Sequence, residues 1–221
     1  MEHLTLIIPA KNEKESLPIV LNELKKYNLN IIVVLEKEDL DTINSIKEYD
    51  CKILYQINKG YGDALLLGIR NVKTNFFCIF NADGSFNPNE LKNMYEHAIK
   101  GNADFIFGSR YMNDALSEDD TIVTFIGNKI FTFIGKNFFS LPISDILYTF
   151  VLGNTQKANE LQLEEKKFSL CVELPILAQK SNHKLISVPS HERARIDGKK
   201  KVNAFKDGSL ILFSMIKLFF K

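Results

Sequence analysis

The chain has 221 residues, 45% of them hydrophobic and 25% charged, which is the composition of a globular protein with a substantial core. Its net charge of +1 excludes a general attraction to nucleic acid, so we expect no nucleic-acid partner. The three cysteines are too few and too widely spaced for a disulfide framework or a zinc site, and they favour a reducing compartment. Because the first residues also lack the features of a signal peptide, we expect a cytoplasmic protein.

Short apolar segments alternate with helical patterns over the first 110 residues. The predicted strands cover residues 4–9, 30–35, 52–57, 76–80 and 104–108. The predicted helices between them cover residues 16–27, 40–49, 62–72 and 89–100. The strands are apolar nearly throughout, as expected when helices cover both faces of a parallel sheet. The pattern therefore predicts an α/β fold with a doubly wound, mostly parallel sheet and flanking helices.

The remainder of the chain has a different pattern. Residues 122–141 form a long, Phe-rich stretch with helical spacing, which we expect to be broken near Gly135. This stretch fits either a core helix or a surface that faces a membrane or a lipid acceptor. The other predicted elements are a helix at 168–182, a strand at 184–189 and a mobile polar loop at 191–208.

The simplest domain organisation is one domain followed by a terminal helix. The domain covers residues 1–208, with a front half at 1–110 and a back half at 111–208. The helix at 209–221 is apolar nearly all round but too short to cross a membrane. We expect it either to close the core or to make peripheral contact with the inner face of the membrane.

Polar residues follow each predicted strand of the front half. In open α/β sheets, ligands bind beyond the carboxyl ends of the strands, so these residues are the candidate ligand site. In chain order they are Pro9, Asn12 and Glu13, then Glu36, then Lys59 and Gly60, then Asn81, Ala82, Asp83 and Ser85, and finally Arg110.

The segment after the fourth strand suggests a divalent cation. Asn81, Asp83 and Ser85 alternate along the chain and would project to the same side of an extended segment. Their oxygen atoms suit Mg²⁺ or Mn²⁺, which often bridges a carboxylate to a substrate diphosphate. Gly84 allows the backbone to turn sharply behind Asp83 and to approach a ligand closely.

Residues 4–205 resemble the family 2 glycosyltransferases of GT-A fold, and in particular the dolichol- and polyprenyl-phosphate mannose synthases. Each matching segment is weak alone, but their order and spacing agree over most of the chain. The segments are LIIPAKNEKESLPIVLNEL, NKGYGDALLLGI, FNADGSFNPNEL, ADFIFGSRY, LPISDILYTF and FSLCVELPILAQKSNHKLISVPSHERARIDGKKK.

The resemblance implies inverting transfer of a sugar from a nucleoside-diphosphate sugar to an acceptor. The acceptor would be a polyprenyl phosphate or a cell-surface glycan. Pro9, Glu13 and Glu36 would contact the nucleoside, and arginine and lysine side chains would neutralise phosphates. The other residues implied to bind substrate are Asn12, Lys59, Gly60, Asn81, Ala82, Arg110, Arg193, Arg195 and Lys201.

Two aspartates have implied catalytic roles. Asp83 would help to hold Mg²⁺ or Mn²⁺ on the diphosphate, and Asp145 would be the natural base if the acceptor were a hydroxyl group. Each also has a simpler interpretation. Asp83 precedes a glycine, as turn aspartates often do, and Asp145 is flanked by apolar residues, as a buried structural carboxylate would be.

Several positions depart from the family pattern. Asn81 replaces the first acid of the metal motif, Leu35 stands where an aspartate is usual, and Val151 replaces an arginine. A basic pair is also missing around residues 121–126. These departures favour one alternative, a degenerate non-catalytic protein of the same fold that binds nucleotide sugars or serves as a scaffold. A nucleotidyltransferase is a weaker alternative, because the loop PAKNE after the first strand contains no glycine.

Overall fold

The computed structural model describes residues 1–197 and 204–221, and in this part of the chain seven strands form one sheet. The strand order is β3-β2-β1-β4-β6-β5-β7. All pairs are parallel except those of β6, which runs antiparallel to β4 and β5. The strands are β1 Leu4–Pro9, β2 Asn30–Leu35, β3 Lys52–Tyr55, β4 Phe76–Ile79, β5 Phe105–Ser109, β6 Val151–Asn154 and β7 Leu185–Pro189.

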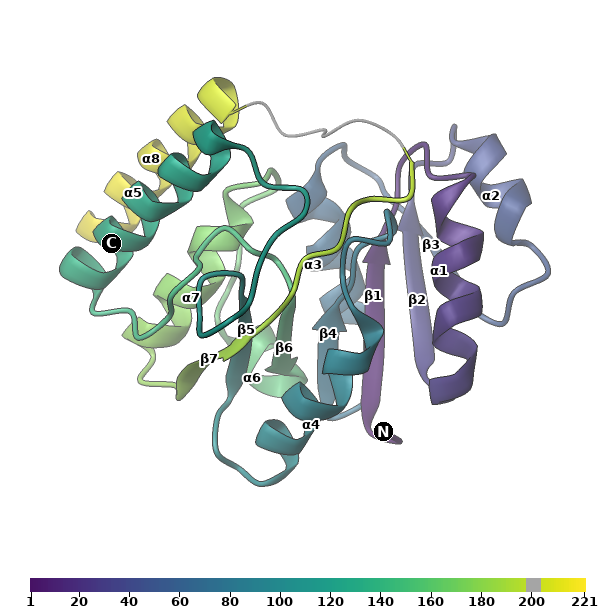
Figure 1. Ribbon diagram of the computed structural model, residues 1–221, viewed down its shortest axis with the longest axis horizontal. Coiled ribbons are helices and arrows are strands. Elements are labelled where there is room, and N and C mark those ends of the chain that lie inside the picture. Colours follow the sequence, from purple (N-terminus) through teal and green to yellow (C-terminus); the bar gives the residue numbers. More distant parts are fainter. Residues whose placement is uncertain (198–203) are drawn as a thin grey trace.

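Helices cover both faces of the sheet (Figure 1). One face packs against α1, α2 and α4, and the other packs against α3, α6 and α7, with α5 and α8 at its edge. The α-helices are α1 Ser16–Leu24, α2 Leu40–Ile46, α3 Tyr61–Asn71, α4 Leu91–Ile99, α5 Ile122–Phe139, α6 Thr155–Glu160, α7 Leu170–Lys180 and α8 Ala204–Phe220.

The two cores explain why the strands are apolar at nearly every position. On β1, Leu6 and Ile8 lie in the core beneath α1, whereas Ile7 lies in the core beneath α3. All three side chains are fully buried. The predicted doubly wound sheet with covered faces is therefore confirmed.

Strand β6 was not predicted from the sequence. It has four residues and contains Gly153, so it lacks the length and the apolar run that indicate a strand. A Cβ atom at Gly153 would lie 2.7 Å from the Phe105 ring and 2.8 Å from the Phe77 ring. The glycine lets β6 fit between two strands that carry large aromatic side chains.

The predicted break near Gly135 is wrong, because α5 continues through this residue to Phe139. A Cβ atom at position 135 would meet Leu141 and Ile146 at 3.0 and 3.1 Å. Gly135 therefore permits close packing of the helix against the segment that follows it, and does not end the helix.

The C-terminal helix is longer than expected. Helix α8 begins at Ala204, so the prediction of a loop up to residue 208 is wrong for its last residues. The helix packs against α5 and α7, and Lys180 Nζ donates a hydrogen bond to the Leu218 carbonyl oxygen (2.6 Å). Figure 1 shows α8 and α5 side by side, on the far side of the molecule from α2.

Candidate active site

A cavity of about 500 Å³ lies where the parallel strands end, at the place predicted for a ligand. Loops from both halves of the chain line it, together with α5 and α8. Its lining includes most of the predicted site residues: Pro9, Glu13, Glu36, Gly60, Asn81, Ala82, Asp83, Ser85, Arg110 and Arg195. Asn12, Lys59, Asp145 and Arg193 are not part of the lining, and Lys201 lies outside the described residues.

The turn after β4 holds Asp83 in a fixed orientation. Asp83 Oδ1 accepts hydrogen bonds from the Ser85 backbone N–H (3.0 Å) and from Ser85 Oγ (2.7 Å). Asn81 Nδ2 donates to Ser85 Oγ (3.2 Å), so the three alternating side chains do lie together. The turn requires a glycine at position 84, where φ is +81°. This arrangement leaves Asp83 Oδ2 to interact with groups other than its own turn.

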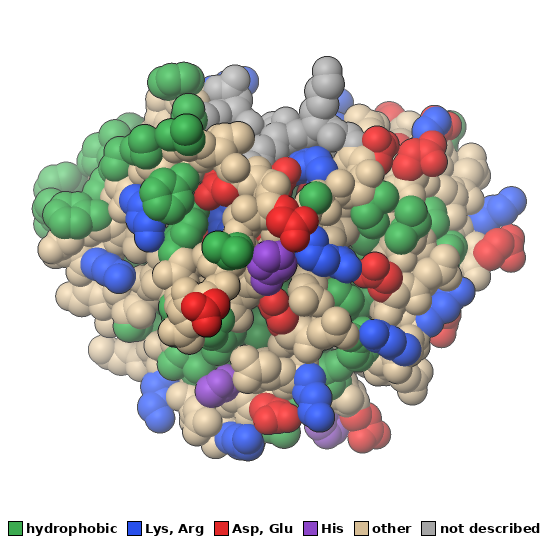
Figure 2. All heavy atoms as spheres, in the orientation of Figure 1, with side chains coloured by type: hydrophobic (Ala, Val, Ile, Leu, Met, Phe, Trp, Pro, Cys, Tyr) green, Lys and Arg blue, Asp and Glu red, His purple; other side chains and the backbone are tan. Residues whose placement is uncertain are grey.

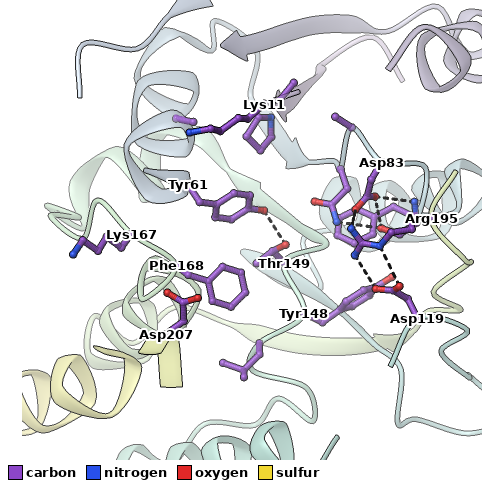
Figure 3. Close-up of a pocket in the computed structure, with 18 of the residues that line it drawn as sticks. Lys11, Tyr61, Asp83, Asp119, Tyr148, Thr149, Lys167, Phe168, Arg195 and Asp207 are labelled. Atoms are coloured by element: carbon purple, nitrogen blue, oxygen red, sulfur yellow. Dashed lines mark hydrogen bonds and ion pairs between the residues drawn. The ribbon is translucent and has the colours of Figure 1, made fainter. Parts of the chain in front are cut away.

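Arg195 lies against that second oxygen (Figure 3). Its Nη1 atom is 3.6 Å from Asp83 Oδ2. On the other side, Arg195 Nε and Nη2 donate to the two carboxylate oxygens of Asp119 at 3.1 and 2.9 Å. The hydrogen bonds to Asp119 raise the pKa of Arg195, with Asp83 adding to the effect. The guanidinium is thus held at the cavity wall between the carboxylates of Asp83 and Asp119.

Glu36 also lines the cavity, as do Pro9 and Gln56. Its carboxylate accepts from Lys11 Nζ (2.7 Å), and Lys59 Nζ lies 3.9 Å away. The Glu36 side chain is only 13% exposed, so it is not a freely solvated loop residue. Gln56 Nε2 donates to the Gly60 carbonyl oxygen (2.9 Å), and both residues line the cavity.

Gly60 and Gly62 make close contacts with backbone from the second half of the chain. A Cβ atom at Gly60 would lie 2.2 Å from the Lys166 carbonyl oxygen, and one at Gly62 would lie 2.3 Å from that of Glu165. The Asp63 N–H also donates to the Lys166 carbonyl oxygen (3.0 Å). These contacts account for both glycines without a phosphate-binding role.

Arg110 and Asp145 form a buried network beneath the cavity. Arg110 Nε and Nη2 donate to the two oxygens of Asp145 at 2.8 and 3.0 Å, and Arg110 Nη1 donates to Glu192 at 3.1 Å. Asn128 on α5 also donates to Asp145, and Ser117 donates to Glu192. Burial by itself would lower the pKa of Arg110, but Asp145 and Glu192 more than compensate and raise it.

This network limits what its members can do chemically. Asp145 has an exposure of 0%, and both of its oxygens accept hydrogen bonds. A proton acceptor must reach the group that it deprotonates, so the geometry favours the structural interpretation of Asp145 over the catalytic one. Arg110 faces the cavity, but its charge is already balanced by two carboxylates.

Arg193 points away from the cavity. Its Nη2 atom donates to Glu23 on α1 (2.9 Å) and to the Phe86 carbonyl oxygen (2.8 Å). Its place in the structure therefore differs from that of Arg195, although the two arginines are separated by one residue.

Several cavity residues were not predicted from the sequence. Asp119 anchors Arg195, and Phe168 packs against Tyr61 with ring centroids 5.7 Å apart. Burial raises the pKa of Tyr61, and its hydroxyl group donates to Thr149 Oγ1 (2.9 Å), as Figure 3 shows. Tyr61, Leu147, Phe168 and Leu210 give this part of the cavity an apolar wall. In the sequence, Tyr61 falls in the matching segment NKGYGDALLLGI and Phe168 begins the matching segment FSLCVELP, but neither residue was predicted to line a site.

The donor atoms after β4 fit a hard divalent cation under one condition. Among residues 1–197 and 204–221, no cluster of three or more His, Cys, Asp and Glu side chains could hold a metal ion. Asp83 offers one carboxylate, and Asn81 and Ser85 can add only neutral oxygens. Mg²⁺ is commonly held by one or two carboxylates when phosphates and water supply the remaining ligands. The residues thus fit a cation that arrives with a diphosphate, and not one bound by protein alone.

Residues 5–161 match the family model described as "Glycosyl transferase family 2". The chain belongs to glycosyl transferase family 2. The match covers most of the chain and confirms the resemblance inferred from the ordered motifs. As a member of this family, the protein is a glycosyltransferase.

Named relatives of this family 2 glycosyltransferase share about a quarter of its residues. UDP-N-acetylglucosamine–dolichyl-phosphate N-acetylglucosaminyltransferase of Methanococcus voltae is 25% identical over 209 residues, which are 83% of each protein. A glycosyltransferase of Mycobacterium bovis is 25% identical over 207 residues, covering 94% of this chain and 93% of the relative.

Solved glycosyltransferase structures share its fold. Glucosyl-3-phosphoglycerate synthase from Mycobacterium tuberculosis, crystallised with Mn²⁺, UDP and glucosyl-3-phosphoglycerate, matches with a TM-score of 0.77. The match covers 98% of this chain and 80% of that one, at 10% identity. A structure of the same enzyme with Mg²⁺ and UDP has a TM-score of 0.74. At such low identity the likeness shows the fold alone, and it confirms the predicted GT-A architecture.

Proposed function

We propose that this protein transfers a sugar, with inversion, from a UDP-sugar to a polyprenyl phosphate at a membrane surface. The observation that carries the proposal is the cavity at the strand ends, which places Asp83 and Arg195 side by side and opens next to an exposed apolar surface. The relative from Methanococcus voltae, named for a UDP-sugar donor and a dolichyl-phosphate acceptor, supports the same pairing of substrates.

The nucleoside would bind between Pro9, Glu36 and Gln56, and the diphosphate beside Asp83 and Arg195. Arg195 can pair with phosphate oxygens because a guanidinium presents several N–H donors in one plane. Asn81, Asp83 and Ser85 are the residues that would hold Mg²⁺ or Mn²⁺. A cation bound there neutralises charge on the diphosphate.

The acceptor phosphate is already anionic, so its oxygen needs little help from a base. A new bond forms between that oxygen and the anomeric carbon, while the bond between the anomeric carbon and the diphosphate breaks and UDP leaves. This route agrees with the buried, fully hydrogen-bonded state of Asp145. The apolar wall formed by Tyr61, Leu147 and Phe168 suits the isoprene units closest to the phosphate.

An apolar ridge on α5 and α8 supports a membrane-bound acceptor. Figure 2 shows hydrophobic side chains gathered over these two helices. Its members are Ile122, Val123, Phe125, Ile126, Ile130, Phe133, Phe138, Phe205, Leu212, Phe213, Ile216, Phe219 and Phe220, each at least 40% exposed. Soluble proteins rarely leave so many large apolar side chains together in water unless the surface binds something.

The lysine side chains of α5 and α8, and the lengths of the helices, favour a membrane surface as the partner of this ridge. Helix α5 carries Lys129 and Lys136 but no acidic residue, and Lys217 and Lys221 lie at the end of α8. Lysines beside an exposed apolar face are typical of helices that lie on anionic membranes. In the described part of the chain, every helix is too short or too polar to traverse a bilayer.

The same helices also line the cavity. Asn128 on α5 and Leu210 on α8 face the cavity, while Phe133 and Phe213 on the same helices are 64% and 68% exposed. An acceptor anchored in a membrane beneath the apolar ridge could therefore present its phosphate to the cavity without leaving the bilayer.

Transfer assays test this proposal. We expect labelled sugar to move from UDP-N-acetylglucosamine, or from another UDP-sugar in a panel, to a polyprenyl phosphate in anionic vesicles. The unphosphorylated polyprenol should not be labelled. Asp83→Asn should lower turnover by about a hundredfold or more, because it removes the one carboxylate of the turn. The matched control Asp114→Asn changes an exposed aspartate outside the cavity and should leave turnover unchanged.

Labelling of a soluble glycan in place of the lipid phosphate would overturn the proposed acceptor. Binding of UDP without transfer to any acceptor would instead support a non-catalytic nucleotide-sugar-binding protein. Asn81 favours this second candidate, since an amide adds no charge to the cation site.

A further inference from the structure

Gln56 is fixed from two directions at the point where β3 ends. Its backbone N–H donates to the Leu35 carbonyl oxygen at the end of β2 (2.9 Å). Its side-chain Nε2 atom donates to the carbonyl oxygens of Asn58 (3.1 Å) and Gly60 (2.9 Å) in the turn that follows. The side chain cannot rotate without losing both of these hydrogen bonds, so its place in the cavity wall is set by the fold.

These hydrogen bonds also decide which way the amide faces. Both partners of Nε2 are carbonyl oxygens, which only accept hydrogen bonds, so the opposite orientation would place Oε1 against two other oxygens. Since Nε2 is committed to the turn, Oε1 is the polar atom of this side chain that remains for a ligand. No residue in the described part of the chain donates a hydrogen bond to Oε1. Gln56 thus offers the cavity a single, neutral hydrogen-bond acceptor.

The ends of β1, β2 and β3 lie side by side around this acceptor. The Ala10 N–H donates to a carbonyl oxygen at the end of β2 (2.9 Å), and the Gln56 N–H does the same one residue further along β2. Pro9 and Ala10 bring apolar surface to the cavity that Gln56 and Glu36 also line. Glu36 is already paired, because its carboxylate accepts from Lys11 Nζ (2.7 Å). Apolar surface with a few fixed polar atoms is typical of sites that bind small ring-containing ligands in one orientation.

We propose that Gln56 selects the base of the donor nucleotide, because its Oε1 atom accepts a hydrogen bond from N3–H of uracil. The inference rests on the proposed function and deepens it by naming the residue that distinguishes a UDP-sugar from other nucleotide sugars. Uracil carries a hydrogen on N3, whereas N3 of cytosine is itself an acceptor and would face Oε1 with no hydrogen between them. Guanine presents two adjacent donors, N1–H and the N2 amino group, and a single acceptor pairs with only one of them. A site that hydrogen-bonds one group of its ligand discriminates strongly against analogues that lack this group.

A set of nucleotides tests this inference on the unaltered protein. Isothermal titration calorimetry in the presence of Mn²⁺ gives the affinities of UDP, CDP, GDP and UDP methylated at N3. We expect UDP to bind at least about tenfold more tightly than each of the other three. CDP and N3-methyl-UDP both keep the ribose and the diphosphate, so a difference from UDP reports on the edge of the base alone.

Gln56→Met tests whether this residue is responsible for the selectivity. Methionine has a similar length but no amide, so the affinity ratio of UDP to CDP should fall to within about threefold of unity. A merely structural role of Gln56 would weaken both nucleotides equally and leave the ratio unchanged. The matched control is Gln156→Met, which alters an exposed glutamine on α6 outside the cavity and should keep the ratio of the unaltered protein. If circular dichroism shows that Gln56→Met does not fold, the comparison of UDP with N3-methyl-UDP and CDP still decides.

The outcomes separate this inference from the function on which it rests. If UDP and CDP bind equally well, or if Gln56→Met keeps the full preference for UDP, the inference is wrong and the proposed donor remains intact. If GDP binds and UDP does not, or if no nucleotide binds, the proposed donor and the inference are both wrong.

Discussion

Arg110 and Asp145 form a bidentate ion pair beneath the cavity, with N–O distances of 2.8 and 3.0 Å, although 35 residues separate them in the chain. Asp145→Ala would leave the Arg110 guanidinium buried with one of its two partners removed. We expect this substitution to lower the free energy of unfolding by about 3–5 kcal/mol, as for other broken buried ion pairs. Urea denaturation followed by circular dichroism measures the loss, and Asp114→Ala is an exposed control.

The opposite result would assign Asp145 a different role. If Asp145→Ala kept its stability but lost turnover, the carboxylate would act in catalysis and its burial would have to be relieved when substrate binds.

Gly84→Ala should disturb both the turn after β4 and the segment that carries Arg195. Position 84 has φ +81°, and a methyl group there would collide with Ile196. The backbone conformation alone costs about 1–2 kcal/mol for a residue with a Cβ atom. We expect lower stability together with weaker UDP binding, because Arg195 would shift from Asp83. Thermal denaturation and calorimetry measure the two effects.

Gly127→Ala is the control for this substitution. A Cβ atom at Gly127 would meet nothing within 4 Å, and the residue lies inside α5. Alanine favours helix more than glycine does, so the control should be neutral or slightly stabilising. Equal losses in the two variants would contradict the role assigned to Gly84.

Because of Asp104, we expect the free energy of unfolding to depend on pH under acidic conditions. Burial alone would raise its pKa, but hydrogen bonds from Lys157 Nζ (2.6 Å) and the Lys184 backbone N–H (2.9 Å) lower the pKa below the usual value of an aspartate. A carboxyl group whose pKa is lower in the folded protein than in the unfolded chain stabilises the fold at any pH above its pKa in the unfolded chain. This stabilisation is lost as the pH falls through its pKa in the folded protein. Asp104→Asn should therefore cost about 1–2 kcal/mol at pH 7 and progressively less below about pH 4.

Chemical denaturation of both proteins between pH 3 and pH 7 checks this prediction. A difference in unfolding free energy that stays constant over this range would show that Asp104 acts through something other than its charge.

The apolar ridge predicts binding to anionic vesicles. Phe133→Gln combined with Phe213→Gln removes one exposed side chain from each helix. Burial of a phenylalanine side chain contributes about 1.5–3 kcal/mol, so the double variant should bind vesicles at least about tenfold more weakly. Co-sedimentation with vesicles of increasing anionic lipid content measures the partition. The matched control is Leu40→Gln with Ile57→Gln, which alters side chains that are 63% and 92% exposed elsewhere.

If the two double variants bound vesicles equally well, the proposal that the ridge binds a membrane would be wrong. Turnover on a detergent-solubilised acceptor should change much less than vesicle binding does.

The strands and helices of the front half could be predicted from the sequence because their signals are local. A strand buried on both faces is apolar at nearly every position, as in residues 4–9. Asn87 caps the 3₁₀ turn Pro88–Glu90 that precedes α4, through its own side chain (3.1 Å to the Asn89 N–H). The cluster of Asn81, Asp83 and Ser85 was also predicted, but the turn at Gly84, and not an extended segment, brings the three side chains together.

The sequence by itself thus determined the layered α/β fold, the position of the candidate ligand site at the strand ends and membership in the glycosyltransferase family. Only the tertiary structure showed that β6 is inserted between β4 and β5, that Asp145 is locked by Arg110, and that Arg195 lies against Asp83 while Arg193 turns away. Periodicity and turn chemistry depend on neighbouring residues, whereas these contacts depend on loops that meet only after folding. No local pattern in the sequence encodes which of two nearby arginines will find a distant carboxylate.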